Sequence, residues 1–84
     1  MKITITITMS ENGRSCDIQV SDTQKIAETL LVLQENINIF KHADMIHTVR
    51  EKRTGRHIST ECTYEEAGIY SGTELLLPAS NGLV

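Results

Sequence analysis

Near its N-terminus the chain reads Lys2-Ile3-Thr4-Ile5-Thr6-Ile7-Thr8-Met9, in which apolar and polar residues alternate strictly. A period of two places every apolar side chain of this segment on one face of a β-strand and every polar one on the other. The segment therefore predicts the first strand of a sheet that has one apolar face.

A second strand is expected to return beside the first. Residues 11–14, Glu-Asn-Gly-Arg, supply a turn, because Asn-Gly suits the positive φ angles of tight hairpins. Three apolar residues then alternate with polar ones: Cys16, Ile18 and Val20. The first twenty residues thus predict an antiparallel β-hairpin.

The apolar spacing changes to that of a helix after Ser21. The buried stripe is expected to hold Ile26, Ala27, Leu30, Leu33, Gln34 and Ile37. Ser21 and Gln24 have the spacing of a capping box, and Asp22 or Thr23 is the alternative cap. We expect about three to four helical turns that end near Asn36 and pack on the apolar face of the hairpin.

Three further strands are expected after an irregular stretch at residues 38–44: residues 45–52, 57–60 and 73–78. In the first of them the pattern leaves open whether Ile46 or Val49 faces the core, because a slip of one residue inverts the faces. A brief helical turn at residues 64–69, closed by Gly68, precedes the last strand.

This order of elements indicates an α+β fold of the β-grasp type. The last strand, with Leu75 and Leu77 on its core face, must insert in the middle of the sheet. We therefore predict a mixed four- to five-stranded sheet packed on one helix. Residues 1–78 form the domain, at a length near the lower limit for a single core, and residues 79–84 form a short flexible tail.

The segment from Cys62 to Leu77 has the order found in the ubiquitin family: a threonine, an apolar residue, a polar turn, an isoleucine and alternating leucines. The chain is more specifically similar to the YukD/EsaB family of small bacterial ubiquitin-like proteins, which accompany type VII (WXG100) secretion systems. The shared features are the alternating Ile and Thr opening, a short strand after a charged turn, and a Cys-x-Tyr-x-x-x-Gly-Ile turn. The resemblance covers residues 2–78.

The resemblance implies a non-enzymatic interaction module that binds its partners non-covalently. It would be a cytoplasmic accessory or regulatory component of a type VII secretion system, and recruitment to the inner face of the membrane is compatible with this role. The expected partner is a protein, a membrane component of the secretion machine. The resemblance leaves the oligomeric state open between a monomer and a weak dimer.

The residues after the last strand bear on the alternative function. They run to Gly82-Leu83-Val84 and contain no Gly-Gly pair. A covalent modifier needs a diglycine end, because only backbone without side chains can thread a narrow activating site. We therefore expect non-covalent binding, and the alternative is a covalent ubiquitin-like modifier or sulfur carrier with a processed tail.

Charge is distributed unevenly, although the chain as a whole carries −3. Residues 41–57 hold five cations and two anions: Lys41, Arg50, Lys52, Arg53 and Arg56 against Asp44 and Glu51. This basic segment suits an acidic protein surface or anionic lipid headgroups, and the alternative is a solvated face without a ligand. Nucleic acid is not an expected partner, because the net charge is negative and the chain has three aromatic residues for stacking.

The partner-binding residues that we expect lie on the sheet face away from the helix: Leu76, Pro78, Arg50, Lys52 and Arg53. An apolar Leu76 on that face suggests docking, although single exposed leucines are also common without any partner. Leu31 and Val32, at the edge of the helical stripe, are a second candidate surface.

Other chemistry finds little support in the sequence. His42, Asp44 and His47 are the nearest approach to a metal site, but a fourth ligand at suitable spacing is missing. Cys16 and Cys62 have no CxxC spacing and are expected to be free thiols. No apolar run approaches the roughly 20 residues that span a bilayer. We predict no enzymatic activity, no cofactor, no metal and no membrane span.

Overall fold

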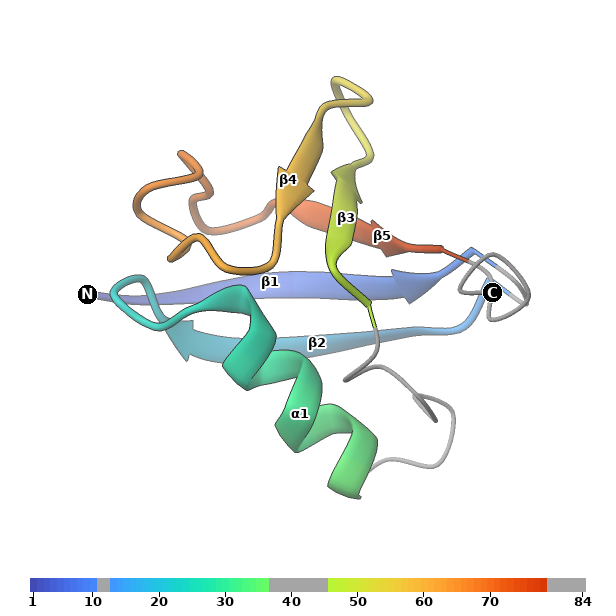
Figure 1. Cartoon of the computed structure of the whole chain (residues 1–84), viewed down its shortest axis with the longest axis horizontal. Coiled ribbons are helices and arrows are strands. Elements are labelled where there is room, and N and C mark those ends of the chain that lie inside the picture. The colour runs from blue at the N-terminus through green and yellow to red at the C-terminus, as the bar shows by residue number, and fades with distance from the viewer. Residues whose placement is uncertain (11–12, 37–45, 79–84) are drawn as a thin grey trace.

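The computed structural model describes residues 1–10, 13–36 and 46–78, which build one sheet and one helix (Figure 1). The elements are β1 (Lys2–Met9), β2 (Ser15–Ser21), α1 (Ile26–Asn36), β3 (Thr48–Glu51), β4 (His57–Ser59) and β5 (Glu74–Leu77). Several sequence expectations fall outside the described residues: Asn12 in the first turn, Ile37, the 38–44 stretch with His42 and Asp44, and the 79–84 tail.

The sheet has the strand order β2-β1-β5-β3-β4. β1 pairs antiparallel with β2 and parallel with β5, and β3 runs antiparallel to both β5 and β4. The last strand along the chain thus lies in the middle of the sheet. The predicted α+β architecture, a mixed sheet packed on one helix, is confirmed with five strands.

The core lies on one face of this sheet, between the strands and α1. In β1 and β5 the alternation holds without exception, and Ile5, Ile7, Leu75 and Leu77 are each at most 1% exposed. A fully buried aliphatic side chain contributes about 1.5–3 kcal/mol relative to an exposed one. These two neighbouring central strands are therefore a main source of the stability of the fold.

The start of α1 differs from the predicted capping box. Ser21 belongs to β2, and its hydroxyl is bonded to that of Thr23 at 2.9 Å. The helix begins at Ile26, where the amides of Ile26 and Ala27 donate to the carbonyls of Cys62 (3.0 Å) and Thr60 (2.8 Å). The first open amides of the helix are thus satisfied by backbone from a distant segment instead of a local side-chain cap.

The buried stripe of α1 holds Ile26, Thr29, Leu30 and Leu33. Thr29 was not expected there, and it is buried because its hydroxyl accepts a hydrogen bond from Tyr64. Ala27 and Gln34 are half-buried. Leu31 and Val32 are 46% and 53% exposed, so the second candidate surface is open to solvent.

The later strands are shorter than the sequence indicated. Ile46 and Val49 are both buried, which resolves the open alternative: β3 begins only at Thr48, so a period of two does not relate these side chains. The brief helical turn expected before β5 is present: the Ala67 amide donates to the Thr63 carbonyl at 3.1 Å, and Gly68 closes the turn with a φ of 72°.

Candidate partner-binding surface

The outer face of the sheet, opposite α1, is built by the residues that alternate with the core positions. Strand pairing places one residue from every strand side by side on it: Ser15, Thr8, Leu76, Arg50 and His57. We call these five residues the Leu76 row. Adjacent strands lie about 4.8 Å apart, so one ligand can contact neighbouring residues of the row at the same time.

Leu76 is the apolar centre of this row. It is half-buried on β5, with Thr8 of β1 on one side and Arg50 of β3 on the other. Pro78 follows β5 and is also half-buried, two residues beyond Leu76 along the chain. The structure thus places Leu76 and Arg50 side by side on the outer face, and Pro78 follows directly after the end of β5.

The predicted cations are not equivalent. The side chain of Arg50 is exposed and has no hydrogen-bond or ion-pair partner among the described residues. Lys52 Nζ lies 3.5 Å from Glu74 Oε1, and the other oxygen of this carboxylate accepts a 2.8 Å hydrogen bond from Thr8 Oγ1. Lys52 therefore has an ion-pair partner within its own sheet, whereas the charge of Arg50 is available to a partner.

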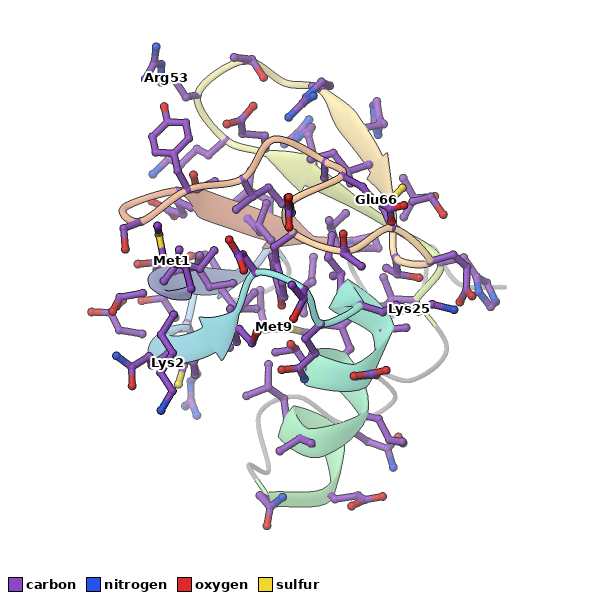
Figure 2. All side chains as sticks on the ribbon, turned by 90° about the vertical axis from the view of Figure 1, so that its left-hand side faces the viewer. Met1, Lys2, Met9, Lys25, Arg53 and Glu66 are labelled. Atoms are coloured by element: carbon purple, nitrogen blue, oxygen red, sulfur yellow. The ribbon has the colours of Figure 1, made fainter. Side chains whose placement is uncertain are left out.

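Arg53 stands at the end of the β3–β4 hairpin, far from α1 (Figure 2). Its Nη1 donates a 2.9 Å hydrogen bond to the hydroxyl of Tyr70, a residue that is 53% exposed. An open pocket of about 460 Å³ is lined by Arg53 and Tyr70 together with Lys52 and Glu74. The sequence did not single out Tyr70 as a surface residue, and its position after the buried Ile69 was the available signal.

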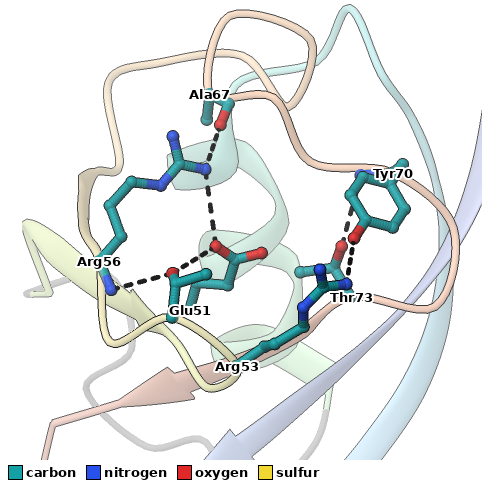
Figure 3. Close-up of polar contacts among 7 residues, drawn as sticks. Glu51, Arg53, Arg56, Ala67, Tyr70 and Thr73 are labelled. Carbon is teal, nitrogen blue, oxygen red and sulfur yellow. Dashed lines mark hydrogen bonds and ion pairs between the residues drawn. The ribbon is translucent and has the colours of Figure 1, made fainter.

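Arg56, one of the five cations that the sequence places in residues 41–57, makes contacts within the fold (Figure 3). Its Nη2 donates to the carbonyl of Ala67 at 2.6 Å and lies 3.7 Å from Glu51 Oε1. Glu51 is nearly buried and also accepts a 2.7 Å hydrogen bond from Thr54. Glu51 shares the core face with Val49, and a carboxylate at such a position requires a nearby donor. This group of contacts joins the β3–β4 hairpin to the 64–69 turn.

The described residues do not assemble a metal centre: they contain no group of three or more His, Cys, Asp or Glu side chains that could hold an ion. His47 is exposed, and Cys16 and Cys62 are half-buried free thiols. No described helix has the length and apolar character needed to cross a bilayer.

Comparison with known proteins links this geometry to a fold family. A scan against protein-family models gave no match, and a search of curated proteins gave none either. Solved structures match well. Ubiquitin of Caldiarchaeum subterraneum superposes with a TM-score of 0.70 at 16% identity and 94% coverage of both chains. The C-terminal ubiquitin-like domain of mouse tubulin-specific chaperone e has a TM-score of 0.70 at 15% identity, over 94% of this chain and 87% of that domain.

The chain has the ubiquitin-like β-grasp fold. A de novo design based on ubiquitin also matches this ubiquitin-like structure, with a TM-score of 0.71 at 25% identity, over 90% of this chain and 85% of the design. Identities at this level establish the fold of the ubiquitin-like domain and leave its function to the site.

Proposed function

We propose that this ubiquitin-like domain is a non-enzymatic interaction module that binds a protein partner non-covalently through the Leu76 row. It serves as a cytoplasmic accessory or regulatory component of a type VII (WXG100) secretion system, and its partner is a membrane component of that machine. The resemblance of residues 2–78 to the YukD/EsaB family supports the setting. The geometry of the outer face supports the mode of action.

The observation that carries the proposal is the placement of Leu76 directly beside the unpaired Arg50. Apolar contact around Leu76 would supply affinity, since its side chain still has surface to bury. Arg50 has five N–H donors and no acid of its own chain among the described residues to occupy them. The partner surface therefore presents an apolar side chain next to a carboxylate.

The electrostatic part of this contact chiefly sets the association rate and the orientation of the partner. Arg53 lies in the loop after β3, three residues beyond Arg50, and is bonded to the Tyr70 hydroxyl, while Lys52 is already paired with Glu74. We expect Arg50→Glu to slow association more than Lys52→Glu does.

The test is affinity capture of the tagged protein from its own host, with bound proteins identified by mass spectrometry. Three forms are compared: the native protein, Leu76→Glu, and Leu31→Glu as the matched control. Leu31 is an exposed leucine on α1, within the second candidate surface, so its substitution adds the same charge away from the Leu76 row and would reveal binding through α1 instead. Secretion-machine membrane components should accompany the native protein and Leu31→Glu but not Leu76→Glu.

Two other results would count against the proposal in different ways. Equal capture by Leu76→Glu would show that the surface is wrong while the setting stands. Absence of secretion components from every sample would show that the setting is wrong. Intact mass of the native protein separates the covalent alternative, because a modifier or sulfur carrier would show adducts, a thiocarboxylate or a trimmed end in place of the unmodified 9.4 kDa chain.

A further inference from the structure

The two edges of the sheet differ in length and protection. β4 has three residues, whereas β2 has seven and keeps an unbroken register with β1 from Lys2↔Ser21 to Thr8↔Ser15. None of the described strands lies on the other side of β2. Among the described residues, the outer edge of β2 is thus not paired with another strand along its length.

The direction of the backbone groups of β2 follows from the bonds at the two ends of the hairpin. The Met9 amide donates to the Arg14 carbonyl (2.8 Å), and the Asp22 amide donates to the Met1 carbonyl (2.9 Å). Every second pair of an antiparallel ladder is hydrogen-bonded, so Cys16, Ile18 and Val20 bond to β1. The amides and carbonyls of the alternate residues of β2 therefore point outward.

Two further contacts agree with this assignment of inward and outward backbone groups in β2. Thr6 is the residue opposite Asp17, and its amide donates to the Thr73 carbonyl at 3.0 Å. The backbone amide of Thr6 therefore points toward β5 and not toward β2. The Asp17 carbonyl accepts only a long contact, 3.7 Å, from the thiol of Cys16. The outward groups of Asp17 and Gln19 are thus positioned to bond to another strand.

Natural sheets protect such an edge with lysine, proline, a bulge or a very short strand. β2 has none of these devices: its sequence, SCDIQVS, contains one charged residue, Asp17, and neither lysine nor proline. On the core side, Cys16 and Ile18 pack against the core and are only half-buried. The edge therefore offers open backbone groups and apolar surface together.

We propose that β2 pairs antiparallel with β2 of a second copy of this chain, about a two-fold axis at Ile18. Among symmetric registers, this one pairs all seven residues of Ser15–Ser21. It sets Asp17 opposite Gln19 of the second copy, where the amide can donate to the carboxylate, and it sets Ile18 against itself. A two-fold axis at Asp17 would instead oppose two like charges, which is destabilising.

The proposed dimer has a defined geometry. It is independent of the proposed function. The two sheets become one continuous sheet, and a two-fold axis normal to it keeps both outer faces on the same side. The dimer thus presents two Leu76 rows in one direction. The contact is small, so it belongs to the weak, concentration-dependent class.

The first test is sedimentation equilibrium of the native protein and of Gln19→Pro across a wide range of concentrations. The Gln19 amide points away from β1, so proline there removes no bond within the sheet and blocks the outward pairing. Native protein should show a monomer–dimer equilibrium, and Gln19→Pro should raise the dissociation constant by roughly tenfold or more. A native protein that stays monomeric, or an equally dimeric Gln19→Pro, would overturn the proposal.

The second test checks the register and does not rely on the proline variant. Ile18→Cys in a Cys16→Ser, Cys62→Ser background should form a disulfide dimer under copper phenanthroline, because the two introduced thiols face each other on the axis. Cys62→Ser alone, which retains Cys16, should not, since Cys16 then faces Val20 of the second copy. Cross-linking through Cys16 but not through the thiol introduced by Ile18→Cys would contradict the register.

Discussion

Tyr64 and Thr29 meet in the core across 35 residues of sequence, where the Tyr64 hydroxyl donates a 2.7 Å hydrogen bond to Thr29 Oγ1. Tyr64 is fully buried, and burial raises its pKa to about 12, an effect that the bond to Thr29 partly opposes. A buried phenol must stay neutral, because the ionised form would lose its hydration without a compensating partner. This pair therefore couples the stability of the core to alkaline pH.

The free energy of unfolding should fall between about pH 10 and pH 12. Tyr64 has its ordinary pKa of 10.0 in the unfolded chain and a raised one in the fold, so its contribution is complete below pH 10 and is lost as the pH rises. The loss amounts to roughly 2 to 3 kcal/mol at the upper end. Urea unfolding at several pH values would measure it in native protein, Tyr64→Phe and Tyr70→Phe.

In Tyr64→Phe the free energy of unfolding should no longer show this fall between pH 10 and pH 12. Tyr70→Phe should still show it, because Tyr70 is exposed. At neutral pH, Tyr64→Phe leaves the Thr29 hydroxyl without its donor and should cost about 1 to 2 kcal/mol. An identical alkaline slope in Tyr64→Phe and the native protein would assign the effect to other groups.

Among the elements, the β3–β4 hairpin depends on its turn for the placement of Arg50 and Arg53. Gly55 has a φ of 74°, its amide donates to the Glu51 carbonyl at 2.8 Å, and the Glu51 amide in turn donates to the Arg56 carbonyl. A side chain at Gly55 would meet no atom within 4 Å. The requirement for glycine is thus a matter of backbone conformation and not of space.

Gly55→Ala should lower the free energy of unfolding by about 1 to 2 kcal/mol, the cost of holding an L-residue in the left-handed region. Gly55→Asn should cost clearly less, because asparagine tolerates this conformation. Urea midpoints at an unchanged slope would measure both effects. If Asn and Ala were equally costly, steric crowding at the turn would have to replace backbone conformation as the explanation.

At the level of the whole molecule, the two ends of the domain meet in the middle of the sheet. β5 lies between β1 and β3, and Leu75 and Leu77 are fully buried. Closing the parallel β1–β5 pair requires almost the entire chain, so the fold can form only after β5 is present.

A chain of residues 1–78 should therefore unfold cooperatively with nearly native stability, as expected for the 1–78 domain. A chain of residues 1–73 should be unfolded, because the central strand and its two buried leucines are gone. Far-ultraviolet circular dichroism during thermal denaturation would compare them with the full chain. A cooperative transition in 1–73, or a marked loss of stability in 1–78, would contradict this view of the domain.

Much of the architecture was predictable, because strand periodicity is a local property. The alternation in KITITITM and the leucines of ELLL assigned the core faces of β1 and β5 correctly. The position of Leu76 on the outer face followed from the same pattern. The partners of the cations could not be predicted from this pattern. Lys52 pairs with Glu74, 22 positions away, and Arg56 bonds to Ala67, 11 positions away.

Periodicity in the chain established which side chains are apolar and on which face they lie, since each strand residue alternates with its immediate neighbours. Only the tertiary structure decided where α1 begins, which cations remain unpaired and which edge of the sheet is open. Each of these depends on backbone or side chains that folding brings from elsewhere, as when the carbonyls of Thr60 and Cys62 satisfy the first amides of the helix. A local pattern cannot specify such partners, because the hydrogen bonds of a buried group are completed by whatever the fold places beside it.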